Sequence, residues 1–201
     1  ALTANNFDAF NDNVKNEING RVSRTQSYSS HVTYLAVSPF NSLRTDIAPY
    51  WGSSTGMALP SPWDTLDIGN AYVVSAFANF VDEGIKKFDP LYINYAIEIN
   101  EYYHNQTGHL SELTYFCSNV YTFLKNKYPN KKFMVSFVLK DPGSTTMTDT
   151  ATLFNSIKDY TDIIGVSVYP YAFFSHSDKG DPNNLPSDWL SQIETVAPGK
   201  P

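Results

Sequence analysis

The stretch Tyr92–Tyr103, YINYAIEINEYY, decides how the rest of the chain is interpreted. It begins as an apolar run rich in β-branched and aromatic residues, which is typical of a parallel strand buried on both faces. Two carboxylates, Glu98 and Glu101, follow where that strand should end. A carboxylate at the end of a buried strand costs desolvation energy unless it is paired or used in chemistry. Glu98 and Glu101 are therefore the first candidates for a functional site.

Apolar periodicity on either side of this stretch predicts alternating helices and strands. The predicted helices cover 5–19, 70–88, 110–128 and 150–160, followed by a last helix that Ser187 can cap. The other predicted strands cover 32–37, 133–139 and 163–168. Gly20 is expected to end the first helix, with 21–30 as a polar connection. Such alternation is typical of an α/β fold with a parallel sheet and right-handed crossovers.

Periodicity leaves open whether this sheet closes into a barrel or stays open and doubly wound. The chain has no GxGxxG or GxxxxGKS motif, which counts against an open sheet that binds nucleotides. Its 201 residues suit one domain, or part of a larger one. Cys117, the only cysteine, lies in the apolar stripe of helix 110–128 and is interpreted as a core residue.

Composition narrows the possible partners and the compartment. The net charge is −6 and no basic cluster is present, so a nucleic-acid partner is not expected. No apolar run approaches the roughly 18 residues that a membrane span needs, so no membrane partner is expected either. The many Tyr, Ser, Thr and Asn residues favour an extracellular, secreted protein. Asn105-Gln106-Thr107 matches the acceptor pattern for N-glycosylation at Asn105.

A long loop over 38–69 separates the first predicted strand from the helix at 70–88. Loops of this length inside a compact domain are usually functional. Trp51 and Trp63 in this loop are candidate sugar contacts, because a pyranose ring offers an apolar C–H face to an aromatic ring. The alternative is that both rings pin the loop to the rest of the fold. The sequence leaves these two interpretations open.

Four segments together resemble the clan A glycoside hydrolases. These segments are TYLAVSPF at 33–40 with RTDIAPYWG at 44–52, MALPSPWD at 57–64, YAIEIN at 95–100 and TDIIGVSVYPYAF at 161–173. The chain most resembles the arabinogalactan endo-β-1,4-galactanase group and its uncharacterised relatives. The resemblance covers about 32–201 and implies a (β/α)8 TIM barrel, of which this chain would supply strands three to six. Residues 1–201 would then form a single, partial barrel domain of about four β/α units.

The resemblance also assigns roles to residues at the strand ends. Glu98 falls on the family's general acid/base, and an apolar strand end favours the protonated form that a proton donor needs. If Asn100-Glu101 is instead matched to the family's Asn-Glu pair, Glu101 takes that role. Ile97 stands where the family has an asparagine that binds the sugar 2-hydroxyl. The family's nucleophile is a glutamate at the end of strand seven, which in this mapping follows Pro201.

The remaining candidates are weighed against structural roles. The predicted sugar contacts at strand ends are Asn100, Tyr169, Tyr171, Ser38 and Arg44. If Glu98 is not catalytic, it is expected to pair with a cation, either Arg44 or Lys140. Tyr169 could donate a hydrogen bond to the nucleophile, or it could be a core ring with a satisfied hydroxyl. His104 and His109 are interpreted as surface residues. The cluster Asp178, Asp181, Asn183 and Asn184 could hold Ca²⁺ but lacks the spacing of a calcium loop, so no metal is expected. The hydrolase that the resemblance implies needs no cofactor.

Four strands of an eight-stranded barrel would leave two bare parallel edges. The chain is therefore expected to be a fragment, or to be completed by a missing segment or a second chain. The leading hypothesis is a secreted hydrolase that cleaves a β-linked polysaccharide or oligosaccharide with retention, which needs two carboxylates about 5 to 5.5 Å apart. The alternative is a non-catalytic extracellular barrel that binds carbohydrate or has a structural role.

Overall fold

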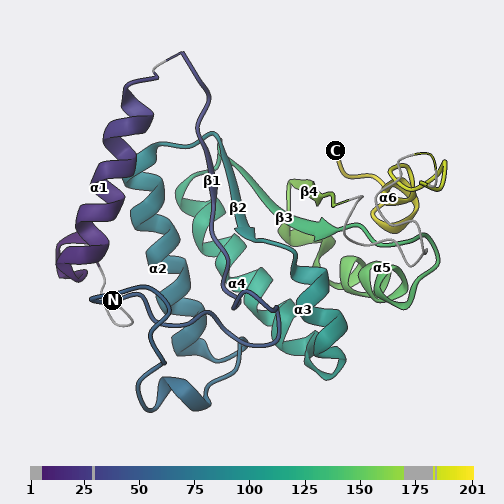
Figure 1. Cartoon of the computed structure of the whole chain (residues 1–201), viewed down its shortest axis with the longest axis horizontal. Coiled ribbons are helices and arrows are strands. Elements are labelled where there is room, and N and C mark those ends of the chain that lie inside the picture. The colour runs from purple at the N-terminus through teal and green to yellow at the C-terminus, as the bar shows by residue number, and fades with distance from the viewer. Residues whose placement is uncertain (1–5, 29, 170–182, 184) are drawn as a thin grey trace.

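The computed structural model describes residues 6–28, 30–169, 183 and 185–201 (Figure 1). Within these ranges four strands form one sheet: β1 Tyr34–Ala36, β2 Tyr92–Ala96, β3 Lys132–Val138 and β4 Ile163–Ser167. The α-helices are α1 Asp12–Gln26, α2 Ala71–Phe88, α3 Ile99–Asn105, α4 Leu110–Lys127, α5 Thr145–Ile157 and α6 Gln192–Val196. Short 3-10 helices occupy Phe7–Ala9, Trp63–Thr65, Thr107–His109 and Lys158–Tyr160.

The sheet is parallel throughout, and its strands follow one another in sequence order, β1-β2-β3-β4. A doubly wound sheet reverses its strand order at a switch point, whereas these four strands show no reversal. Helix α2 packs on α4 and α4 packs on α5, so the crossover helices line up along one face of the sheet (Figure 1). The predicted α/β class with a parallel sheet is confirmed, and the sheet is singly wound over its described strands.

The core lies between the sheet and these helices. Alternate residues of a strand point to opposite faces, and Ile93 and Tyr95 of β2 point to the helical side. Both are fully buried, as are Phe133 of β3 and Phe116 of α4. Cys117 is fully buried in the same core, and burial raises the pKa of its thiol to about 12. The interpretation of Cys117 as a core residue is confirmed.

The opposite face of the sheet is polar and partly open to solvent. Asn94 of β2 donates from Nδ2 to the Tyr34 hydroxyl and to Ser136 Oγ, both at 3.0 Å. This row of hydrogen bonds crosses from β1 to β3. Tyr34 and Tyr92 on the same face are exposed. The two faces therefore differ: one packs on helices, and the other carries linked polar groups.

The chain returns to the sheet at its last residues. The backbone oxygen of Pro201 accepts a hydrogen bond of 2.9 Å from the N–H of Ile164, and Lys200 Nζ donates to Thr161 O at 2.7 Å. Residues 200 and 201 therefore lie beside β4, on the edge that does not face β3. Among the described residues no helix is both long and apolar enough to cross a bilayer.

Several of the predicted boundaries are wrong, and the first helix starts at Asp12, not at residue 5. Helix α1 does not stop at Gly20 but continues to Gln26, because a helical glycine costs only about 1 kcal/mol and Val22 packs on the cluster that Val14 and Ile18 form. Helix α5 starts at Thr145, not at 150, because Ser144 caps it by accepting from the N–H of Met147. Helix α6 starts at Gln192, well after Ser187.

Helix α3 was not predicted at all. The stretch from Tyr92 leaves the strand conformation after Ala96, and α3 begins two residues later. Ile99, Tyr102 and Tyr103 are buried at helical spacing, and this spacing is the signal in the sequence that could have revealed α3. The apolar strand in front of it made the whole stretch resemble one element. Because β2 ends at Ala96 and α3 begins at Ile99, Glu98 lies in the connection between a strand and a helix.

Candidate functional site

Glu98 occupies the N-cap position of α3 in a left-handed backbone conformation, with φ 55° and ψ 43°. This conformation costs a non-glycine residue about 1 kcal/mol or more, so the surroundings must hold it in place. Ser136 of β3 contributes to this, since its Oγ accepts the backbone N–H of Glu98 at 3.0 Å. The Glu98 side chain is 14 % exposed. A strained, mostly buried carboxylate at a strand end supports a functional role.

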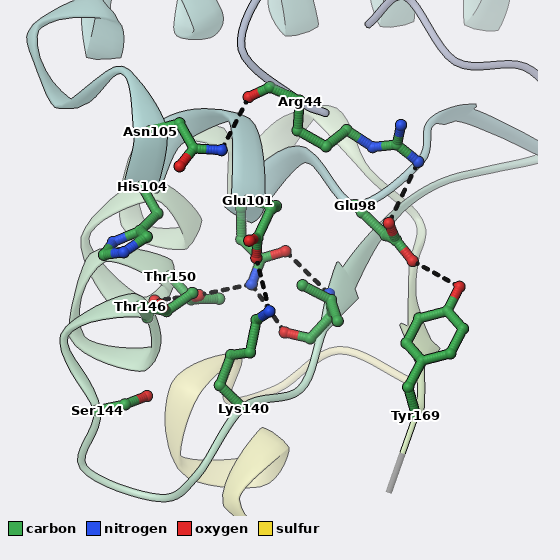
Figure 2. Close-up of polar contacts among 12 residues, drawn as sticks. Arg44, Glu98, Glu101, His104, Asn105, Lys140, Ser144, Thr146, Thr150 and Tyr169 are labelled. Carbon is green, nitrogen blue, oxygen red and sulfur yellow. Dashed lines mark hydrogen bonds and ion pairs between the residues drawn. The ribbon is translucent and has the colours of Figure 1, made fainter. Parts of the chain in front are cut away.

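Both oxygens of the Glu98 carboxylate have protein partners (Figure 2). Arg44 Nη2 lies 3.2 Å from Oε2, and the Tyr169 hydroxyl donates to Oε1 at 2.9 Å. Arg44 follows β1, Glu98 follows β2 and Tyr169 follows β4, so the three side chains converge at the carboxyl end of the parallel sheet. The structure thus brings together three of the residues that the sequence singled out.

The charges at this site act on Tyr169 in opposite directions. The hydrogen bond to Glu98 and the charge of Glu98 raise the pKa of the Tyr169 phenol above its ordinary value. The nearby Arg44 guanidinium opposes this effect, because a positive charge favours the phenolate. The phenol of Tyr169 therefore acts as a hydrogen-bond donor to Glu98 at neutral pH.

Arg44 is itself held in a left-handed conformation, with φ 56°. Its Nη1 donates to the backbone oxygen of Asn41 at 2.8 Å, and its side chain is 16 % exposed. Its Nε atom is buried, and none of the described residues accepts a hydrogen bond from it. A buried donor without a partner is costly, so the other contacts of the Arg44 side chain must hold it in this position.

Glu101 belongs to a separate ion pair. Its Oε2 lies 3.3 Å from Lys140 Nζ, and the pair lies on the side of α3 that faces β3 and α5 (Figure 2). Of the two carboxylates considered for acid/base chemistry, Glu98 is the one that meets Arg44 and Tyr169. The alternative that pairs Glu98 with Arg44 is observed, and Lys140 pairs with Glu101 instead.

Asn100 has a structural position. Its side chain is fully buried, donates from Nδ2 to Val138 O at 2.9 Å and to Thr150 Oγ1 at 2.8 Å, and accepts the N–H of Val138 at 2.9 Å. These bonds join α3 to β3 and α5. The predicted contact between Asn100 and a sugar has no exposed surface to support it.

Ser38, Trp51 and Trp63 lie in a different place. They line a largely apolar cavity of about 430 Å³ between α1, α2 and β1, and Glu98 is not part of its lining. The Trp51 ring packs edge-on against Phe80 with 6.5 Å between centroids, and Trp63 packs on the main core. This arrangement favours the interpretation that both tryptophans pin the loop. Their contact with a sugar stays a prediction.

Side chains at the end of α3 reach back to the loop that carries Arg44. Asn105 Nδ2 donates to Arg44 O at 3.1 Å and to Leu43 O at 3.4 Å, and Gln106 Nε2 donates to Thr45 O at 2.9 Å. Asn105 is exposed, as a glycan acceptor must be. His104, interpreted as a surface residue, is partly exposed and pairs with Asp149 at 2.7 Å. The hydrogen bonds from Asn105 and Gln106 to the Arg44 loop were not foreseen from the sequence.

Several predicted positions lie outside the described residues: Tyr171, Asp178, Asp181 and Asn184. In the part of the chain that is described, no group of three or more His, Cys, Asp or Glu side chains is arranged to hold a metal ion. A scan against models of protein families and a search of curated proteins found no match to this chain.

Proposed function

We propose that this chain is part of a β/α-barrel glycoside hydrolase and that Glu98 is its general acid/base. The observation that carries the proposal is the convergence of Arg44, Glu98 and Tyr169 at the carboxyl end of a singly wound parallel sheet. Active sites of β/α barrels lie at this end. The left-handed backbone of Glu98 at the same place adds to the argument.

Closure of the sheet into a barrel is part of the proposal. A sheet that keeps its strand order and carries its crossover helices on one face curls in one direction, as barrels do. The exposed face with Tyr34 and Tyr92 would become the barrel interior. The hydrogen bond from Ile164 to Pro201 shows that the outer edge of β4 can pair with extended backbone, and in the proposed barrel the next strand would pair there. The missing strands would come from the same polypeptide or from a second chain.

The chemistry needs a second carboxylate. In the retaining reaction Glu98 gives its proton to the leaving glycosidic oxygen while a nucleophilic carboxylate attacks the anomeric carbon, and Glu98 then takes a proton from the water that releases the sugar. Among the described residues the other nearby glutamate, Glu101, is paired with Lys140. A strand added at the edge of β4 would end next to Tyr169 and could supply the nucleophile.

A second function is favoured by the pairing of Glu98 itself. Each of its carboxylate oxygens already accepts a hydrogen bond, from Arg44 or from Tyr169, so Glu98 is held by the protein in the way that a structural or binding role requires. Ile97, next to Glu98, replaces the asparagine that the resembling family uses. Both features suit a secreted barrel that binds carbohydrate without cleaving it.

One experiment separates the two functions. The natural polypeptide that contains this chain would be incubated with a panel of β-linked polysaccharides, and new reducing ends would be counted for wild type, Glu98→Gln and Glu101→Gln. We expect Glu98→Gln to lose about a hundredfold or more in rate, and Glu101→Gln to keep most of it. Folding would be checked by circular dichroism. A wild-type protein that binds these glycans without releasing reducing ends would favour the second function.

A further inference from the structure

Both ends of the short helix α3 are connected to the same loop. Glu98 at its N-cap binds the guanidinium of Arg44, while Asn105 at its C-terminal end binds the backbone oxygen of Arg44 (Figure 2). The next residue, Gln106, binds the backbone oxygen of Thr45. The helix has seven residues and is therefore about 10 Å long. The Arg44 side chain covers the distance between the two attachment points.

The turn that presents Arg44 is closed by its own hydrogen bonds. Asn41 accepts the N–H of Thr45 on Oδ1 at 3.0 Å, and its backbone oxygen accepts the N–H of Arg44 at 3.2 Å. These bonds define the shape of the turn but do not connect it to α3. Glu98 accepts from the Arg44 side chain. In the other direction, the side-chain amides of Asn105 and Gln106 donate to backbone oxygens of this turn. The Phe40 ring, just before the turn, also stacks on Tyr102 of α3 with 4.4 Å between centroids, but the two amides are the contacts that hold the backbone of residues 43–45 directly.

We propose that Asn105 and Gln106 form an amide clamp that positions the Arg44 guanidinium against Glu98. They are positioning residues, because they act through Arg44 and do not touch Glu98. Their effect on turnover rests on the proposed function, whereas the clamp itself concerns only the geometry of the loop. Asn105 is also the acceptor of the Asn105-Gln106-Thr107 sequon. Because glycosylation replaces one of the two amide hydrogens, a glycan on Asn105 weakens the clamp.

The buried Nε–H of Arg44 offers a readout that does not require activity. Hydrogen exchange at this group needs the loop to open, so it reports how firmly Arg44 is held. It would be measured by NMR in the natural polypeptide, with the Arg44 signal assigned by its loss in Arg44→Gln. The variants are Asn105→Ala with Gln106→Ala, each single change, and Thr107→Ala as the matched control, which removes the sequon and keeps both amides.

We expect exchange at Arg44 Nε–H to rise about tenfold or more in the double variant, by less in each single variant, and not at all in Thr107→Ala. If the double variant does not fold, the single variants carry the test. Exchange that stays at the wild-type rate in folded variants overturns the clamp.

Hydrolysis rates then test the link to the proposed function. In an active parent protein the double variant should lose about tenfold in kcat/KM, because a misplaced charge near the acid/base disturbs the reacting geometry. Faster exchange in the variants of a parent protein that hydrolyses nothing would support the clamp and contradict the proposed function. Faster exchange with unchanged kcat/KM would support the clamp as a loop anchor and overturn its role in positioning for turnover.

Discussion

Among single residues, Glu98 shows how a local pattern and distant contacts combine. Its place after an apolar strand is visible in the sequence, and so is the cost of a carboxylate there. Its partners are 54 and 71 positions away, at Arg44 and Tyr169. No local rule connects such distant positions. The sequence therefore suggested Arg44 as only one of two cations for Glu98, and the fold selected it over Lys140.

The titration of Tyr169 tests this arrangement. Arg44→Gln removes a positive charge that favours the phenolate, so we expect the pKa of Tyr169 to rise further. Glu98→Gln removes the negative charge that disfavours the phenolate, so we expect the pKa of Tyr169 to fall towards the ordinary value of tyrosine. NMR of ¹³C-labelled tyrosine would follow both shifts, with Tyr169→Phe identifying the signal. If the pKa of Tyr169 were the same in wild type and both variants, the proposed effect of Glu98 and Arg44 on the phenol would be wrong.

At the level of elements, charged groups join α2 to α4 away from the candidate site. Asp82 of α2 is buried and accepts from Lys127 of α4, from Tyr128 directly after α4 and from Lys86 of its own helix. Burial alone would raise the pKa of this carboxyl. The hydrogen bonds from these three donors outweigh burial and hold the pKa below its ordinary value of 3.8.

This lowered pKa predicts how stability depends on pH. The folded state binds the Asp82 proton less readily than the unfolded state, so its contribution is complete above the ordinary pKa and is lost as pH falls through the folded value. We expect wild type to lose more stability between pH 5 and 2 than Asp82→Asn does, with stability measured by urea unfolding. Asp82→Asn should itself cost about 1 kcal/mol at pH 7, because Lys127 and Tyr128 lose a charged acceptor, whereas Lys86 keeps its ion pair with Glu83 and both lysines are partly solvated. Parallel pH profiles for the two proteins would contradict this assignment.

At the level of the whole molecule, the site depends on how closely neighbouring strands approach. Gly165 of β4 lies directly against Ser136 of β3, the residue whose Oγ accepts the N–H of Glu98. A Cβ at Gly165 would lie 3.0 Å from the Cβ of Ser136, which is closer than ordinary packing allows. The spacing of β3 and β4 and the support of Glu98 are therefore coupled through this glycine.

We expect Gly165→Ala to destabilise the fold by about 1 to 3 kcal/mol, because the added methyl group overpacks the contact with Ser136. Gly108→Ala is the matched control, since a Cβ there meets no atom within 4 Å. Urea unfolding would measure both changes. If Gly165→Ala were as stable as the Gly108→Ala control, β3 and β4 could accommodate the extra methyl group without a loss of stability, and the predicted overpacking would be wrong.

Three features could be inferred before folding is considered: the alternation of helices and strands, the burial of Cys117 and the place of Glu98 at a strand end. These features follow from local periodicity, because side-chain direction repeats along each element. The folded molecule was needed to establish the strand order, the partners of Glu98, the existence of α3 and the packing of Trp51 and Trp63 beside the cavity between α1, α2 and β1. Each of these depends on contacts between residues far apart in the chain, and the free energy of such contacts is set by packing and not by local spacing.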